Sequence, residues 1–227
     1  MEQNTNKMYQ FTNDEIAELP TLLSAPRFAR YLAETGNDTE QALKLYQWNL
    51  ELSGEFLKVL HICEIGIRNG ISDAITEVHG DRWPWVQGFR VSLQNPRRGY
   101  NPRRNLEDVA RLQPSTGKVI AELKFAFWER MLNSSHQQRL WDHKLEHGFP
   151  NADRTKGSAA AREKLRNSTY AVRSLRNRIA HHEPIFYRPS LTDDFDHIIS
   201  LIDARCAHSA AWIGRWERVT FLLNNKP

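Results

Sequence analysis

Apolar residues recur at intervals of three and four along most of the chain, whereas no segment alternates apolar and polar positions. A repeat of three and four residues places side chains on one face of an α-helix, while strict alternation is typical of a half-buried strand. The pattern therefore predicts an all-α protein, built as a bundle of helices around one core.

The first two helices are predicted from residues that favour helix ends. Thr12 and Glu15 have the spacing of a capping box, which indicates the start of a short helix. A second helix is expected over about 26–34, with a proline at an early position and Gly36 just after its end. These segments predict additional helices before the main bundle.

The longest apolar stripe covers residues 38–80, where Asp38 can cap the start and Gly80 the end. Ser53 and Gly54 are poor helix formers in the middle of this stripe, so we expect a break between two helices there. The buried positions expected on this stripe are Ala42, Leu45, Trp48 or Asn49, Leu52, Phe56, Leu60, Cys63, Ile67, Ile71, Ala74 and Val78.

The middle of the chain, residues 83–114, is rich in Trp, Pro, Gly and Arg and has little periodicity. We expect an irregular insertion there, with one short helix at 105–112. Periodicity returns from residue 115 to residue 223. The sequence thus predicts a single domain over 1–227, with a helical core of about 38–80 and 115–223.

A further helix is expected before Pro184. The buried positions expected on it are Leu165, Thr169, Val172, Leu175 and Ile179.

The composition is that of an ordinary globular protein, with 227 residues, 40% hydrophobic residues and a net charge of +4. Cys63 and Cys206 lie in apolar, helical stretches, so we expect free thiols in a reducing cytosol. No membrane span, secretion signal, metal or cofactor is expected. His143 and His147 have the spacing of a metal-binding pair, but no third ligand follows nearby.

Positive charge is concentrated in two segments. Residues 88–106 carry five arginines and no acidic residue, and residues 154–178 carry eight basic residues and one acid, Glu163. The first segment can follow an RNA backbone with Tyr100 stacked on a base, or it is a solvated basic loop, or it pairs with Asp193, Asp194 and Asp196. The arginines assigned to RNA contact in this segment are Arg97, Arg98, Arg103 and Arg104.

The segment that carries candidate chemistry is 175–184, Leu-Arg-Asn-Arg-Ile-Ala-His-His-Glu-Pro. At about 100° per residue, Asn177 and His181 point away from the helix face that Leu175 and Ile179 bury. Arg176 flanks this pair. Histidine is the side chain that exchanges protons near neutral pH, arginine supplies fixed positive charge for a phosphorane, and an amide orients either group.

These three side chains are suited to cleave RNA without a metal: His181 as acid or base, Arg176 as stabiliser of the transition state and Asn177 as the positioning group. In-line cleavage benefits from a second imidazole, which a symmetric dimer would supply. An exposed Asn and His on a basic helix are also typical of a solvated face. His182 falls on the core side, which indicates a structural histidine or a partner of the helix C-terminus, and Glu183 either holds a histidine or is a charge at the helix end.

Several stretches resemble Abi-like (abortive infection) proteins, a branch of the HEPN superfamily, and together they extend over nearly the whole chain. The most specific is Leu175–Phe186, and one departure is Phe125-Ala-Phe-Trp128, where relatives commonly have Phe-Gly-Phe-Trp. The other stretches are Arg27-Phe28 with Tyr31, Ala42–Asn49, Glu64–Asn69, Gly117–Trp128, Leu140-Trp141 and Phe149-Pro150.

This resemblance implies a helical fold in which Arg176 and His181 form a metal-independent ribonuclease site at a dimer interface. The implied biology is growth arrest during phage infection, with RNA, a second copy of the chain, and an antitoxin or phage-derived trigger as partners. Two rival hypotheses are a catalytically silent module that binds RNA or a nucleotide, and a protein-interaction component of a defence assembly.

Four further residues are assigned supporting or binding roles. Glu64 and Arg68 lie four apart on a helix, which is typical of an ordinary intrahelical ion pair. The resemblance equally favours a Glu64 that reaches the Arg176/His181 site and orients a charged group. Arg173 and Arg178, on the same helix as His181, are assigned to RNA contact.

Overall fold

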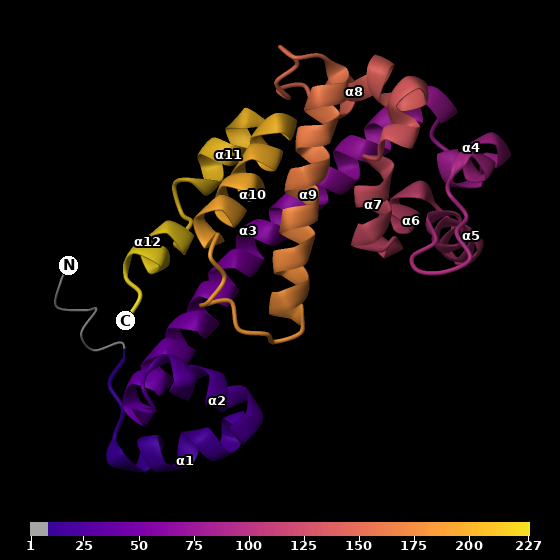
Figure 1. The fold of residues 1–227 in the computed structure, drawn as a ribbon. Coiled ribbons are helices and arrows are strands. Elements are labelled where there is room, and N and C mark those ends of the chain that lie inside the picture. The colour runs from indigo at the N-terminus through magenta and orange to yellow at the C-terminus, as the bar shows by residue number, and fades with distance from the viewer. Residues whose placement is uncertain (1–8) are drawn as a thin grey trace.

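The computed structural model describes residues 9–227, and within that range the secondary structure is entirely helical (Figure 1). The predicted all-α class is therefore confirmed for this part of the chain. The α-helices are α1 Asn13–Leu23, α2 Ala25–Glu34, α3 Thr39–His79, α4 Gln87–Ser92, α5 Pro102–Leu112, α6 Thr116–Glu122, α7 Phe125–Met131, α8 Asp142–Gly148, α9 Ser158–Ala180, α10 Leu191–Arg205, α11 Ala207–Ile213 and α12 Val219–Asn224.

One helix, α3, organises the whole molecule and runs through it without a break for 41 residues (Figure 1). The break expected at Ser53 and Gly54 is wrong. The buried stripe keeps its phase across this point from Leu52 to Phe56, so packing on both sides holds the helix together. Ser53 also bonds its hydroxyl to the carbonyl oxygen of Asn49 at 2.7 Å. The helix ends before Gly80, whose φ is 78°.

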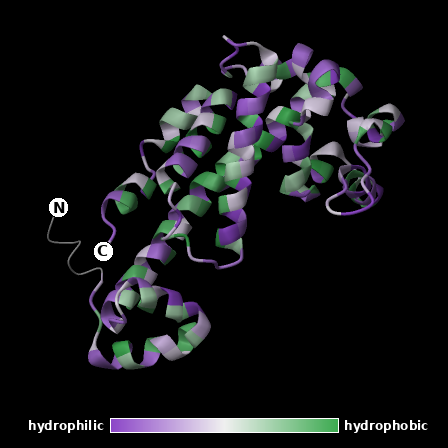
Figure 2. Ribbon diagram, viewed as in Figure 1, coloured by the Kyte–Doolittle hydropathy of each residue, from purple (hydrophilic) through white to green (hydrophobic). Residues whose placement is uncertain are grey.

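The core forms where other helices cover α3, chiefly α2, α8, α10 and α12, while α9 packs mainly on α10. Figure 2 shows apolar and polar positions side by side along these helices, as expected when each buries one face. All five predicted positions on α9 are buried, and most predicted positions on α3 are buried too. Val78 is an exception with 41% exposure, and Ile75 is the last buried residue of α3.

The two helices α1 and α2 pack at the N-terminal end of α3 (Figure 1). The capping box at Thr12 is confirmed, since its side chain accepts a bond from the backbone of Glu15 and the Glu15 carboxylate accepts one in return. Tyr31 of α2 is buried between Tyr46 of α3 and Phe186, with ring centroids 5.0 Å and 4.8 Å away. This aromatic cluster fixes α2 next to the segment that follows α9.

The segment 83–114 is more regular than predicted. A 3₁₀ turn at Trp83–Trp85, α4 and α5 replace most of the irregular insertion; α5 contains the short helix predicted at 105–112, and the connection 93–101 has no helical structure. Trp83 is fully buried between Phe89 and Trp128. These aromatic contacts stabilise short helices whose sequence alone has little periodicity.

Helices α3 and α8 approach each other closely where Gly70 faces Gly148. A Cβ atom on Gly70 would lie 2.7 Å from the carbonyl oxygen of Gly148, and a Cβ on Gly148 would meet the carbonyl oxygen of Gly70. Because the obstruction is backbone on both sides, neither position accepts a side chain without displacing a helix. The crossing places α8 and the start of α9 against the C-terminal half of α3.

The periodic segment after residue 114 is divided into several separate elements. The stripe from Val119 to Met131 belongs to two helices, α6 and α7, because the chain is extended at Leu123 and Lys124. The last long helix, α10, ends at Arg205, and α11 begins two residues later at Ala207. Two further elements precede α8, a 3₁₀ turn at Ser134–His136 and a π-helix at Gln137–Trp141. Among the residues described, no helix combines the length and apolarity that a membrane span requires.

Candidate functional site

The end of α9 forms a C-terminal capping motif around the candidate histidine. The helix ends at Ala180, and His181 is the C-cap residue, with its backbone N–H bonded to the carbonyl oxygen of Asn177 at 3.0 Å. His182 follows with a φ of 56°. Its N–H bonds to Ile179, and that of Glu183 bonds to Arg178, both at 2.9 Å, which is the Schellman pattern.

The expected place of His182 in the core is wrong, because His182 is exposed. The helical wheel no longer applies beyond Ala180, where the chain turns through a left-handed residue. Glycine is the usual residue at this position, and any other residue there has a strained backbone. The outward direction predicted for His181 agrees with its exposure.

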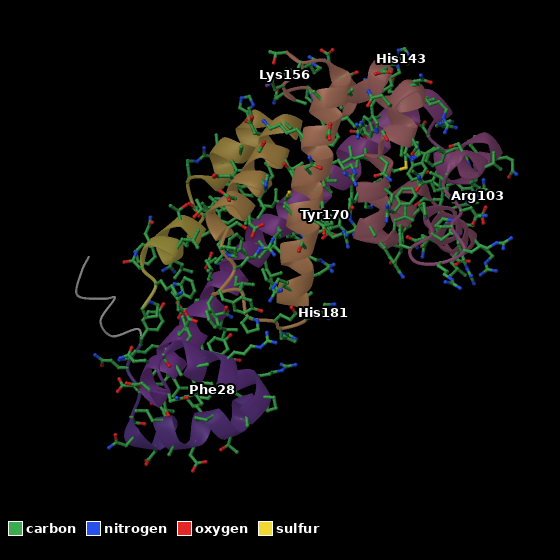
Figure 3. All side chains as sticks on the ribbon, viewed as in Figure 1. Phe28, Arg103, His143, Lys156, Tyr170 and His181 are labelled. Carbon is green, nitrogen blue, oxygen red and sulfur yellow. The ribbon has the colours of Figure 1, made fainter. Side chains whose placement is uncertain are left out.

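His181 lines a pocket of about 560 Å³ between the end of α9 and helix α2. Figure 3 shows His181 at the end of α9 that lies toward the lobe containing Phe28. Arginines from α2 and tyrosines from both α2 and α3 complete the wall. The lining residues are Pro26, Arg27, Arg30, Tyr31, Tyr46, His181, His182, Glu183 and Pro184.

The pocket has an excess of positive charge, because two guanidiniums face one carboxylate, Glu183. Arg27 and Arg30 lie three residues apart on α2, and both are exposed. Burial raises the pKa of the Tyr31 phenol, and nearby Tyr46 and Tyr187 add to the effect, so this phenol stays protonated. The pocket therefore offers cationic and neutral hydrogen-bond donors to an anion.

A second set of contacts fixes the loop that follows His181. The amide oxygen of Asn49, on α3, accepts the backbone N–H groups of Ile185 at 2.8 Å and Phe186 at 3.1 Å. Asn49 is itself buried. The loop is thereby attached to α3 immediately after the capping motif, which limits the positions that His181 can take.

Two arginines meet at the hydroxyl of Tyr187 beside the pocket. Arg30 donates to it at 3.1 Å, and Arg178 donates to it from the other helix. Arg178 also donates to the carbonyl oxygen of Pro184 at 3.2 Å and lies 3.4 Å from the carboxylate of Glu183. Arg178, which was assigned to RNA contact, thus links α9, α2 and the loop.

Arg176 points toward α3 rather than into the pocket. Its Nε lies 3.6 Å from Oε2 of Glu64, and the other carboxylate oxygen of Glu64 accepts Arg68 Nε at 3.1 Å. Arg68 in turn donates to the carbonyl oxygens of Ile120 and Ala121, both at 2.8 Å. Glu64 therefore makes both contacts that were considered for it, the intrahelical pair and the pair with Arg176.

The three residues assigned to catalysis are neighbours at the end of α9, but only His181 lines the pocket. Asn177 and Arg176 are half-buried, and Asn177 contacts His181 through the backbone bond described above. Arg173, one turn earlier, donates to the buried carboxylate of Glu129 and lies over the ring of Tyr170 at 5.7 Å.

The arginines of segment 97–104 lie on α5 and the loop before it, away from His181 in Figure 3. Arg97 and Arg98 are exposed, and Arg104 lies 3.8 Å from Asp108. Arg103 is structural, since its Nε donates to the carbonyl oxygen of Arg90 at 3.0 Å and its Nη2 to that of Val91.

Two interpretations of that segment are corrected by the geometry. Tyr100 is half-buried against the core, and its hydroxyl donates to Asn105 at 2.8 Å, so its ring is not a free stacking surface. Asp194, which was considered as a partner for these arginines, is buried and accepts Arg188 Nη2 at 2.9 Å instead.

Arg27, Arg30 and Tyr46 line the pocket but were not predicted as site residues. Their nearest signal is the spacing of Arg27 and Arg30 on an exposed face of α2, opposite the buried Phe28 and Tyr31. Nothing in the local sequence shows that α2 packs beside the end of α9, because that contact depends on the tertiary cluster around Tyr31 and Phe186.

Among the residues described, no three His, Cys, Asp or Glu side chains are grouped so as to hold a metal ion. His147 Nε2 lies 3.2 Å from Glu77, and Cys63 and Cys206 are both free thiols. Comparison with known proteins found no matching family model, no similar curated protein and no similar solved structure.

Proposed function

We propose that this protein is a metal-independent endoribonuclease of the abortive-infection type, which cleaves RNA at a homodimer interface and arrests growth in phage defence. The observation that carries the proposal is the open pocket in which His181 stands beside Arg27 and Arg30. A proton-exchanging imidazole next to guanidiniums in one concave surface is suited to phosphodiester chemistry. The resemblance of the segment around Arg176 and His181 to Abi-like proteins also supports the proposal.

In the proposed reaction His181 removes the proton of a 2′-hydroxyl, and the O2′ atom attacks the adjacent phosphorus. The bond from phosphorus to the 5′-oxygen breaks, and a second imidazole protonates that oxygen. The products are a 2′,3′-cyclic phosphate and a 5′-hydroxyl. Arg27 and Arg30 stabilise the negative charge of the phosphorane, while the Glu64–Arg176 pair and Asn177 keep the end of α9 in position.

The second imidazole is proposed to come from a second copy of the chain. The face of α3 next to Tyr46 carries Leu50 and Leu57, which are 60% and 45% exposed, and Gly54 between them has open space around it. Exposed apolar side chains one and two turns apart on one helix are typical of a helix–helix interface. A two-fold contact along this stripe would face two His181 pockets toward each other.

One observation favours a second candidate function, a module that binds RNA or a nucleotide without cleaving it. Arg176 is paired with Glu64 and does not line the pocket, so the guanidinium expected beside the reacting phosphate is directed elsewhere. In this case the same pocket would hold a phosphate and the His181 imidazole would serve only as a hydrogen-bond donor.

The deciding experiment measures cleavage of a fluorescent RNA by the purified protein in excess chelator, with His181→Ala and His182→Ala as matched variants. Both side chains are exposed on the same loop, so both variants should fold like the wild type. We expect His181→Ala to lower the single-turnover rate by about a thousandfold, since general acid–base catalysis contributes about 10²–10⁴. His182→Ala should retain a rate close to that of the wild type.

Each result separates the hypotheses. Loss of cleavage in both variants would place the second imidazole in the same chain and overturn the dimeric site. RNA binding with no cleavage in any preparation would favour the binding module. Cleavage that requires a divalent metal or leaves 3′-hydroxyl ends would contradict the proposed mechanism.

The proposed dimer interface has its own test. Leu57→Glu should convert a dimer to a monomer in sedimentation, and a wild-type monomer would contradict the proposed interface.

A further inference from the structure

A second polar pocket, of about 510 Å³, lies beside the N-terminal half of α9. Its walls come from three parts of the chain: α9, the residues after α7 and the residue after Leu93, which caps α4. The lining residues are Gln94, Asn133, Ser134, Ser135, Arg162, Glu163 and Arg166. None of them lines the His181 pocket.

Arg162 brings a buried charge into the wall of this pocket without a direct ion pair, although the exposed Glu163 lines the same pocket and acts on it electrostatically. Only 6% of its surface is exposed. Its Nε donates to the amide oxygen of Gln137 at 2.5 Å, and its Nη1 donates to the carbonyl oxygen of Leu132 at 2.7 Å. Both acceptors are neutral, and no carboxylate among residues 9–227 forms an ion pair with it. Burial lowers the pKa of Arg162, which reflects the cost of a guanidinium away from water.

Arg166 adds a second positive charge one turn along the same helix. Its Nε donates to the amide oxygen of Asn133 at 3.0 Å, again a neutral acceptor. Like charges four residues apart on a helix repel each other. Glu163 is the only carboxylate in the wall; it is exposed and makes no ion pair with either arginine in the part of the chain described. The pocket therefore has a net positive charge and two guanidiniums next to each other.

We propose that this pocket binds a phosphate group. A phosphate would neutralise the pair of guanidiniums and accept their forked N–H donors, which is the geometry that arginine provides for phosphate. Ser134 and Ser135 add hydroxyl donors at the same wall. A buried charge with only neutral partners is costly, and a bound anion removes that cost.

This site is separate from the proposed cleavage site and does not depend on it. His181 follows Arg166 by fifteen positions along α9 and its cap, which corresponds to about 22 Å along the helix. The phosphate can belong to a nucleic-acid backbone or to a free ion or mononucleotide. Gln94 lies in the wall just before the exposed Arg97 and Arg98, which would extend the positive surface toward a longer strand.

The test is isothermal titration of the full chain with three probes: inorganic phosphate, adenosine 5′-monophosphate and a 2′-O-methyl decanucleotide that resists cleavage. The variant is Arg166→Gln, which removes one guanidinium from the pocket. The matched control is Arg111→Gln, which makes the same charge change on α5, where the side chain is 75% exposed. We expect Arg166→Gln to weaken binding about tenfold, the value of one charge-assisted hydrogen bond, and the control to leave it unchanged.

A second variant, Ser135→Ala, keeps the proposal testable if Arg166→Gln does not fold, and it should weaken the same probe about threefold. Arg166-dependent binding of all three probes supports a site for a free phosphate group. Arg166-dependent binding of the decanucleotide alone supports a site for the nucleic-acid backbone. No binding of any probe, or equal weakening by Arg166→Gln and Arg111→Gln, would overturn the proposal. The RNA-cleavage assay with His181→Ala tests the proposed function separately, so the absence of phosphate binding at this pocket would not contradict that function.

Discussion

The two ends of α9 differ in how their polar groups are satisfied. At the N-terminal end, Gln137, Asp142 and Ser158 bond to one another at 2.6–3.1 Å, and the buried Arg162 bonds to Gln137. At the C-terminal end, His181 and His182 are exposed and the helix stops in a strained turn. Both ends belong to a single helix whose middle is buried against α3, α7 and α10.

The two ends of α9 thus have different roles: the buried N-terminal end holds the helix in place, and the exposed C-terminal end presents side chains to solvent. Bonded, buried groups fix the position of α9, and that fixed position presents the other end to solvent. Substitutions of buried groups at the N-terminal end should therefore lower stability, whereas truncation of exposed side chains at the C-terminal end should alter chemistry and leave stability nearly unchanged; relief of the backbone strain at His182 is the exception.

The largest effect is expected from Leu165→Ala, near the N-terminal end of α9. Leu165 is 5% exposed, and truncation of a buried leucine typically costs 2–5 kcal/mol, so we expect a loss of about 3 kcal/mol in the free energy of unfolding. Urea denaturation measures it. His181→Ala should change the same quantity by less than about 0.5 kcal/mol. Equal losses of stability in the two variants would show that His181 is packed as tightly as Leu165 and would contradict the difference between the two ends of α9.

The next effect is a pH dependence of stability caused by His136, which follows α7 and is buried. Burial, and secondarily the charge of Arg139, lower its pKa to about 4. In the unfolded chain histidine titrates near pH 6.5, so below that pH the unfolded state binds a proton that the folded state does not. The contribution of neutral His136 to the free energy of unfolding is therefore fully present above about pH 6.5 and is lost as the pH falls toward 4. We expect a loss of about 2 kcal/mol between pH 7 and 4.5.

Urea denaturation at these two pH values tests this prediction by difference. His136→Gln should reduce the loss between pH 7 and 4.5 by most of that amount, whatever its effect at pH 7. His181→Gln should reproduce the wild-type pH dependence. If both variants behave alike, the buried histidine is not the group responsible.

A smaller effect of opposite sign is expected at the C-terminal end of α9. His182 has a φ of 56°, a conformation that costs a residue with a side chain about 1–2 kcal/mol. His182→Gly should therefore raise the free energy of unfolding by about 1 kcal/mol, less than the strain itself because glycine makes the unfolded chain more flexible. Glu183→Gly, one residue later, should not stabilise. A loss of stability in His182→Gly would mean that the imidazole makes a contact worth more than the strain.

The smallest effect should come from the exposed loop arginines, which lie outside both ends of α9. The double variant Arg97→Gln, Arg98→Gln should change stability by less than about 0.5 kcal/mol, because neither side chain is buried. Its RNA affinity should fall only about twofold at moderate salt, as expected for contacts screened by solvent. A larger loss than that of Arg27→Gln would move the principal RNA-binding surface to this loop.

Much of the fold follows from local sequence, because helical periodicity and caps act over a few residues. Asp38, Gly80 and the buried stripe of α9 are examples in which the local pattern and the structure agree. The continuity of α3 at Ser53 and Gly54 could not be predicted locally, because packing on both sides outweighs two weak helix formers. The short helices of 83–114 depend in the same way on the burial of Trp83 and Phe89.

The candidate site also contains residues that the local sequence predicts and residues that it does not. The exposure of His181 could be predicted from the wheel of α9, since Leu175 and Ile179 define its buried face. The position of His182 could not, because the helix ends without the glycine that usually marks a Schellman turn. Arg27 and Arg30 could not be assigned either, as their place in the pocket depends on contacts between segments about 150 residues apart, such as that of Arg30 with Tyr187.

The length of α3 has a consequence for how the molecule unfolds. With 41 residues it is about 60 Å long, and it carries Tyr46 at the His181 pocket, Glu64 beside Arg176 and Gly70 at the α8 crossing. No cut between residues 39 and 79 leaves a fragment with a complete core of its own. Calorimetry should therefore record a single cooperative transition.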